Sequence, residues 1–202
     1  MAKPYPKEDH LTGNFAPLRM ESNVDDLIIE GNVPKEILGS YYRNGPDPKF
    51  SPRGGKSHWF GGDGMIHAFH INNGKVSYVN RWMRTVKWLK EHEAGEALFP
   101  SGMDPTDTDP SVQGLKTDGL ANTSIVSHAG KILALEEAHA PFEFDPLTLD
   151  SIGSHTFDNK LEGPVTAHPK VDPITGELLF FGYMADGFFS DTIRYTASSK
   201  DG

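Results

Sequence analysis

Short runs of alternating apolar and polar residues, each closed by a turn, recur along this chain and restrict it to an all-β fold. The clearest example joins residues 65–71 to residues 75–82 across Asn72, Asn73 and Gly74. Two alternating strands around an Asn-Gly turn strongly indicate a β-hairpin. Similar patterns predict three more strand pairs, which join residues 123–127 to 131–137, 142–144 to 149–154, and 165–168 to 177–183.

The remaining sequence predicts single strands, few short helices and one long loop. Residues 1–24 are polar and contain prolines, which predicts an N-terminal extended arm ahead of one domain over residues 25–202. The other elements expected are strands over 24–31 and 40–44, a turn or one-turn helix over 33–39, a helix over 88–98 and a loop over 99–119.

Repeated strand-and-turn units with little helix are typical of a sandwich, a barrel or a propeller. The sequence Asp-Pro-x-Thr occurs at residues 145–148 and again at 172–175, which hints at repeated propeller blades. Because Asp-Pro also begins common type I turns, this pattern alone leaves the three architectures open.

Composition excludes several classes of function. The chain has no cysteine, which excludes disulfide frameworks, zinc–thiolate sites, iron–sulfur clusters and cysteine nucleophiles. Its net charge is −9 and its Lys and Arg residues are scattered, so we expect no nucleic-acid partner. No run approaches about 18 apolar residues, and the first residues lack the apolar core of a secretory signal. We therefore expect a cytoplasmic protein, with peripheral membrane contact left open.

Histidines are the residues that suggest a metal site. His67 and His70 are three residues apart, and on a strand they would face opposite sides, so they are not expected to share a metal. His168 ends a short apolar stretch before Pro169, where a strand should stop and a side chain can project off the sheet. Taken alone, such a histidine is more often structural than a metal ligand. Four others lie in turns or polar stretches and are expected to be solvated: His10, His92, His128 and His155.

Glu136 and Glu137 end the apolar strand predicted over residues 131–137. Adjacent strand residues face opposite ways, so one carboxylate is expected to point toward the core, where it needs a partner. The N–H of a metal-binding imidazole is one such partner. A pair of solvent-facing glutamates at a strand end is the alternative, and the residues alone leave both open.

Several segments, taken in order, resemble signature segments of the carotenoid cleavage oxygenase family. They are residues 42–46 (YRNGP), 58–69 (HWFGGDGMIHAF), 119–123 (GLANT), 133–137 (LALEE) and 166–173 (TAHPKVDP) followed by 176–177 (GE). Each segment is short, but their common order over most of the chain makes the resemblance specific. On this basis the chain is similar to the N-terminal portion of a family member.

The resemblance implies a seven-bladed β-propeller, of which residues 25–202 would be an incomplete part, truncated at the C-terminal end. It also implies one Fe(II) held by four histidines, some of them oriented by glutamates. His168 matches the first of these ligands, and Glu137 matches an orienting glutamate. The implied reaction is cleavage of a conjugated C=C bond by O₂ into two carbonyl products. The implied partners are O₂ and an apolar polyene or a stilbene-like molecule.

Two departures from the family pattern qualify this expectation. The other three ligand histidines lie downstream in family members, so residues 1–202 alone are expected neither to hold iron stably nor to catalyse. Stilbene-cleaving members carry a lysine where this chain has Glu136, which favours a carotenoid or apocarotenoid substrate. Cleavage of a lignostilbene, isomerohydrolase chemistry at the same iron site and a non-catalytic propeller binding module remain as alternatives.

Overall fold

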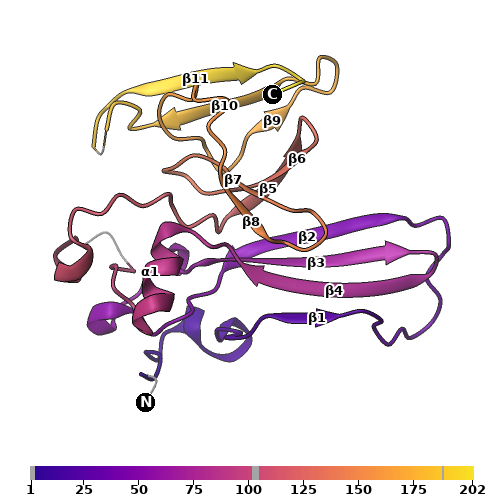
Figure 1. The fold of residues 1–202 in the computed structure, drawn as a ribbon, viewed down its shortest axis with the longest axis horizontal. Coiled ribbons are helices and arrows are strands. Elements are labelled where there is room, and N and C mark those ends of the chain that lie inside the picture. The colour runs from indigo at the N-terminus through magenta and orange to yellow at the C-terminus, as the bar shows by residue number, and fades with distance from the viewer. Residues whose placement is uncertain (1–2, 102–104, 188) are drawn as a thin grey trace.

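The computed structural model describes residues 3–101, 105–187 and 189–202, which form three successive antiparallel sheets (Figure 1). The all-β class expected from the sequence is confirmed. Helices are few and short within the described part of the chain: α1 (Val86–Ala94) and the 3₁₀ turns η1 (Asp9–Leu11), η2 (Gly13–Phe15), η3 (Arg53–Gly55), η4 (Trp59–Gly61), η5 (Pro105–Asp107) and η6 (Pro110–Val112). No helix in these ranges is long and apolar enough to cross a lipid bilayer.

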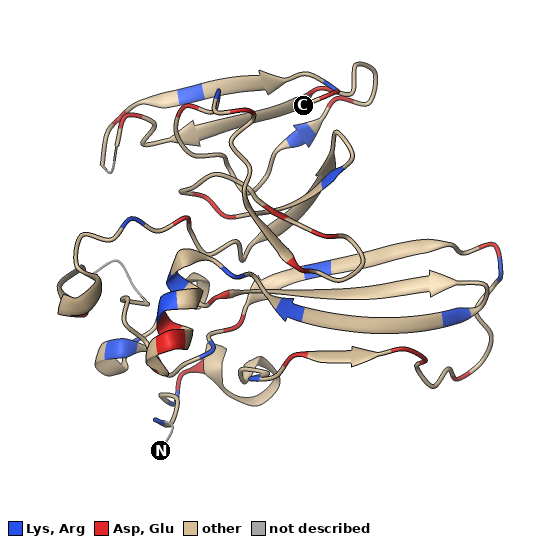
Figure 2. Ribbon diagram, in the orientation of Figure 1, with Lys and Arg blue, Asp and Glu red and all other residues tan. Residues whose placement is uncertain are grey.

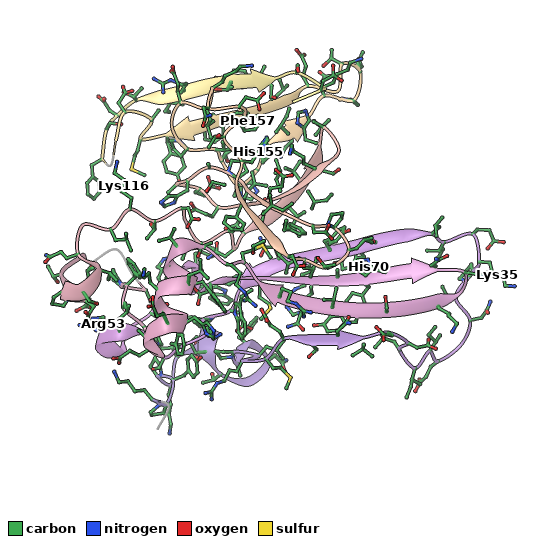
Figure 3. All side chains as sticks on the ribbon, in the orientation of Figure 1. Lys35, Arg53, His70, Lys116, His155 and Phe157 are labelled. Carbon is green, nitrogen blue, oxygen red and sulfur yellow. The ribbon has the colours of Figure 1, made fainter. Side chains whose placement is uncertain are left out.

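The first sheet has the strand order β1-β4-β3-β2. Its strands are β1 (Ser22–Val24), β2 (Gly39–Pro46), β3 (Gly64–Asn72) and β4 (Lys75–Trp82). The predicted hairpin is confirmed as β3–β4, and its turn residues Asn73 and Gly74 both have positive φ, 49° and 77°. Two such residues give the turn a twist that matches the flanking strands. Figure 3 shows Lys35 near one end of this sheet and Arg53 near the other.

The strand predicted over residues 24–31 is wrong in its position. The observed strand, β1, covers Ser22–Val24 and pairs with β4, with Val24 opposite Tyr78. After Val24 the backbone bends, and one further contact with β4 follows, from the Leu27 N–H to the Val76 carbonyl at 2.8 Å. The apolar residues of 24–31 therefore do not continue the alternation, because the two consecutive aspartates after Val24 lie in the bend.

Helix α1 begins earlier and ends earlier than the predicted range of 88–98. Thr85 caps its first turn, with the side-chain oxygen accepting a hydrogen bond from the Trp88 N–H. Gly95 ends the helix in the left-handed conformation, at a φ of 75°, which a glycine adopts at little cost. The capping residues thus set both ends.

Of the loop predicted over 99–119, residues 102–104 lie outside the described residues, and the remainder contains only η5 and η6.

The second sheet is a simple meander and the third contains three strands (Figure 1). Their strands are β5 (Ser124–His128), β6 (Lys131–Leu135), β7 (Phe142–Phe144), β8 (Ser151–Ser154), β9 (Lys170–Val171), β10 (Leu178–Tyr183) and β11 (Ile193–Ser198). The β5–β6 and β7–β8 pairs confirm the sequence predictions. The predicted strand over 165–168 is wrong, because Lys170 and Val171 take the place beside β10 instead.

The three sheets pack face to face in chain order. One apolar core, which includes Ile66, Ala134 and Phe144, lies between the first and second sheets. Another, which includes Leu135, Val165 and Phe180, lies between the second and third. Ala134 and Leu135 are adjacent in β6, so both faces of the second sheet are buried. Stacking of successive sheets in this way is the arrangement of propeller blades.

Charged residues of both signs are spread over all three sheets (Figure 2). The drawing shows no continuous basic stripe over the described residues, in keeping with the net charge of −9.

Candidate metal centre

His168 lies where the second and third sheets meet. The segment before it is anchored rather than extended as a strand: the Thr166 N–H donates to the Phe181 carbonyl at 2.7 Å, and the Ser124 hydroxyl donates to the Ala167 carbonyl. Val165 and Ala167 are buried, whereas the His168 side chain is 66% exposed. The backbone is therefore fixed from both sheets while the imidazole stays accessible.

Glu137 lies two residues after the end of β6 and faces His168. Its Oε1 lies 3.4 Å from His168 Nε2, an ion-pair distance that is long for a hydrogen bond. The Glu137 side chain is 33% exposed. His168 Nδ1 makes no hydrogen bond to any described residue, so one ring nitrogen faces a carboxylate and the other is available.

Glu136 and Glu137 have different partners, as expected for adjacent residues at the end of a strand. Glu136 Oε1 lies 2.5 Å from Nδ1 of His139, a residue that the sequence reasoning did not single out. This hydrogen bond raises the pKa of His139, against the opposing effect of burial. The Glu-x-x-His spacing directly after an apolar strand is the sequence signal that could have identified the pair.

His67 and His70 contact different partners, in keeping with side chains on opposite faces of β3. His67 Nδ1 lies 2.7 Å from the Tyr78 hydroxyl, and burial lowers the pKa of His67. His70 Nδ1 lies 2.7 Å from the Ser40 hydroxyl, on the side of the sheet next to the loop after β7 (Figure 3). Both histidines are therefore engaged in separate structural contacts.

The expectation that four other histidines are solvated is wrong for His128, which is buried. His155 is also partly enclosed, with its ring 4.4 Å from that of Phe157 (Figure 3). His10 is partly buried too and lies 2.6 Å from the Ser57 hydroxyl, whereas His92 is exposed. Packing between sheets and loops decides these cases, and the local sequence does not carry that information.

His168 and Glu137 fit the roles of one iron ligand and the carboxylate that orients it. An imidazole with an open nitrogen and a carboxylate on its other side is the usual arrangement of a histidine ligand and the residue that orients it. Among the described residues there is no group of three or more His, Cys, Asp or Glu that could hold a metal ion together. His168 and Glu137 therefore fit a part of such a site.

A separate group of charges lies between helix α1 and the segment before β3. Lys87 Nζ lies 2.7 Å from Asp63 Oδ1 and 2.7 Å from Glu91 Oε2, and all three side chains are buried. Asp63 belongs to the glycine-rich segment 59–65, which packs here as a turn. Each charged side chain of the group has an oppositely charged partner, so we interpret the group as a structural link between α1 and the segment before β3.

The antiparallel sheets are stacked in chain order, as the blades of a β-propeller are, and a histidine and a glutamate meet between two of them at a candidate metal site. A family model described as RPE65, retinal pigment epithelial membrane protein, matches residues 15–202. The chain belongs to this family, the carotenoid cleavage oxygenases.

The chain is similar to proteins that act on different molecules. It is 41% identical to isoeugenol monooxygenase from Pseudomonas nitroreducens, over 100% of this chain and 42% of that protein. It is 40% identical to carotenoid 9,10(9',10')-cleavage dioxygenase 1 from Arabidopsis thaliana, over 96% of this chain and 38% of that protein. The crystal structure of Pseudomonas brassicacearum lignostilbene dioxygenase matches 100% of this chain and 42% of its own, with a TM-score of 0.93 and 37% identity. The chain thus spans about two fifths of the length of these relatives.

Proposed function

We propose that the whole protein is a non-haem Fe(II) dioxygenase that cleaves a conjugated C=C bond with O₂ to give two carbonyl products. The observation that carries this proposal is the accessible His168 facing Glu137 between two sheets, in a chain of the carotenoid cleavage oxygenase family. The names of its relatives, an isoeugenol monooxygenase and a carotenoid cleavage dioxygenase among them, support oxygenase chemistry.

In this proposal each residue has a simple role. His168 would hold the iron through one ring nitrogen, and Glu137 would fix the orientation of the ring from the other side. Bound ferrous iron supplies open coordination positions for oxygen chemistry. The buried Val165 and Ala167 hold the backbone of His168 in place, so the ring position does not depend on an exposed loop.

We further propose that residues 25–202 are the first blades of a larger propeller whose remaining blades supply three more histidines. The chain spans about two fifths of the length of its relatives, which supports this division. Residues 1–202 alone would then bind iron weakly and lack activity. The cytoplasmic location and the peripheral membrane contact expected from the sequence stay predictions.

Iron content measured on the whole protein tests the role of His168. We expect about one iron per chain in the wild type, and an iron content about tenfold lower or less in His168→Ala, since a ligand matters at least as much as its orienting partner. His155→Ala, which removes a partly enclosed histidine near Glu143, is the matched control and should keep its iron. Equal iron in His168→Ala and the control would overturn the assignment.

Two substrate classes follow from the relatives, and the reaction is the same for both. The Arabidopsis relative is named for carotenoid cleavage, whereas the lignostilbene dioxygenase and the isoeugenol monooxygenase are named for phenylpropanoids. Incubation with an apocarotenal and with a stilbene under ¹⁸O₂ separates these classes. Label in both carbonyl products indicates cleavage, and an isomerised product without label would indicate an isomerohydrolase instead. The absence of any product, together with binding of either compound, would favour the binding-module alternative.

A further inference from the structure

The peptide unit that joins Ala167 to His168 is held at both of its polar ends. Its carbonyl, that of Ala167, accepts a hydrogen bond from the Ser124 hydroxyl, and its N–H, that of His168, donates to Thr166 Oγ1 at 3.2 Å. Because a peptide unit is planar and rigid, the two hydrogen bonds together fix the orientation of its plane. The Cα of His168 lies in that plane, so the point from which the imidazole projects is fixed as well.

The residue that receives the His168 N–H is itself anchored to the third sheet. The Thr166 N–H donates to the Phe181 carbonyl at 2.7 Å, and the side chains of Thr166 and Ala167 are buried, with 1% of each residue exposed. A Cβ at Gly182 would overlap the Pro164 carbonyl oxygen, so the segment lies closer to β10 than any side chain at Gly182 would allow. Water is therefore excluded from these hydrogen bonds, which strengthens them.

Ser124 reaches His168 from the second sheet, the same sheet that carries Glu137. Ser124 lies in β5 opposite Leu135 of β6, and Glu137 lies two residues beyond Leu135. The second sheet thus holds His168 twice, through its backbone by way of Ser124 and through its ring by way of Glu137, whose Oε1 is 3.4 Å from Nε2. The separation of the imidazole from the carboxylate depends on both contacts.

We propose that Ser124 is a positioning residue for His168. Its hydroxyl holds the peptide unit in the orientation that brings the ring to Glu137 and leaves the other ring nitrogen open to a metal ion. Without the hydroxyl, the buried Ala167 carbonyl loses this partner, which favours rotation of the peptide unit toward another donor. This inference rests on the proposed function, in which His168 is an iron ligand.

The affinity of the whole protein for Fe(II), measured by competition with a chelator, tests the inference. We expect Ser124→Ala to weaken binding about tenfold, the lower end of the range for residues that orient a metal ligand, because Ser124 acts on the backbone and not on the ring. Ser124→Thr keeps a hydroxyl and should restore most of the affinity. With cobalt(II) in place of iron, the visible absorption bands should differ between Ser124→Ala and the wild type, since they depend on the ligand geometry.

Ser51→Ala is the matched control. The Ser51 hydroxyl donates to the Pro4 carbonyl at 2.8 Å, a hydrogen bond of the same kind that lies outside the second and third sheets. We expect this variant to keep the iron affinity and the cobalt(II) spectrum of the wild type. Equal losses of affinity in Ser51→Ala and Ser124→Ala would overturn the inference, because they would show that any lost hydroxyl has this effect.

A double variant separates positioning from a general loss of stability. If Ser124 acts through His168, adding Ser124→Ala to His168→Ala should cause no further loss of iron affinity. A further tenfold loss in that background would overturn the inference. So would unchanged affinity in Ser124→Ala beside a loss in His168→Ala, which leaves the proposed function standing. Wild-type affinity in His168→Ala would overturn the role of His168 in the proposed function, and the inference with it.

Discussion

Two groups of charged residues in this chain differ in how deeply they are buried and in how closely their charges are paired. Lys87 lies 2.7 Å from both Asp63 and Glu91, and the three side chains are 10%, 3% and 2% exposed. His168 and Glu137 lie 3.4 Å apart and are 66% and 33% exposed. The first group is enclosed and closely bonded, whereas the second is accessible and loosely paired.

Both carboxylates of the buried group also accept hydrogen bonds from backbone N–H groups. Glu91 Oε1 accepts hydrogen bonds from the Leu98 and Phe99 N–H groups, both at 3.0 Å, and Asp63 Oδ2 accepts one from the Lys49 N–H at 3.1 Å. Burial disfavours the charge on Lys87, but the two carboxylates outweigh it and raise the pKa of Lys87. A buried charge with all its partners holds structure together, and an accessible imidazole with one partner is where further ligands can be added.

The largest expected effect comes from breaking the buried group. Lys87→Met leaves Asp63 and Glu91 buried without their cation, so we expect the free energy of unfolding of the whole protein to fall by about 3–5 kcal/mol. Lys90→Met on the same helix is the control. Lys90 pairs with Glu93 at 3.1 Å on the exposed face, and its loss should change stability by less than about 1 kcal/mol. Urea denaturation measures both, and equal losses would show that burial is not decisive.

The second prediction tests the accessible pair. Glu137→Gln should weaken iron binding by the whole protein about 10–100-fold, because the ligand imidazole loses its orienting carboxylate, while stability changes by less than about 0.5 kcal/mol. Competition with a chelator measures the affinity. Glu143→Gln is the control, since Glu143 also lies near a histidine, His155 at 3.6 Å, but is paired with Lys131. Unchanged iron affinity in Glu137→Gln would contradict the role given to Glu137.

The third prediction concerns pH near the buried group. Burial, with a contribution from the charge of Asp63, raises the pKa of Asp47 from 3.8 to about 6. A carboxyl whose pKa is raised by folding stabilises the protein below its unfolded pKa, and that contribution is lost as the pH rises through about 6. We expect a loss on the order of 1–2 kcal/mol between pH 4 and pH 7, after allowing for screening by solvent.

Asp47→Asn should remove this part of the pH dependence, as measured by urea denaturation at several pH values. Asp145→Asn is the control, because the pKa of Asp145 is shifted in the opposite direction. Hydrogen bonds from the Thr148 and Leu147 N–H groups lower the pKa of Asp145, so its contribution is present above the unfolded pKa and lost as the pH falls. A pH profile in Asp47→Asn identical to that of the wild type would show that Asp47 does not titrate as described.

The smallest expected effect comes from the helix that carries Lys87 and Glu91. Thr85→Ala removes the side-chain cap of α1, so we expect a loss of about 1 kcal/mol in stability with no change in iron content. Thr85→Ser keeps a capping oxygen and should restore most of the loss. Lower iron content in Thr85→Ala would mean that the buried group and the candidate metal centre are coupled. It would contradict the view that the first is structural and the second binds metal independently.

The sequence was most informative where structure is local. The hairpin across Asn73 and Gly74 was predictable because positive φ at both turn residues is a property of those residues. The capping of α1 by Thr85 and Gly95 is equally local, although the predicted range of 88–98 missed it. The family segments singled out His168 and Glu137, and the structure places these two side chains facing each other; their role at a metal stays a prediction.

By itself the sequence determined the all-β class, three of the four predicted strand pairs and the family to which the chain belongs. Only the tertiary structure decided that β9 forms the ladder with β10 while residues 165–168 contribute a single backbone hydrogen bond to it. It also decided that His128 is buried and that Glu136 holds His139 beside a cavity. The physical reason is that each of these outcomes depends on segments far apart in the chain, such as Gly119 packing against Glu136, which no local pattern encodes. Turns and caps follow from single residues, whereas a site follows from what the packed sheets bring together.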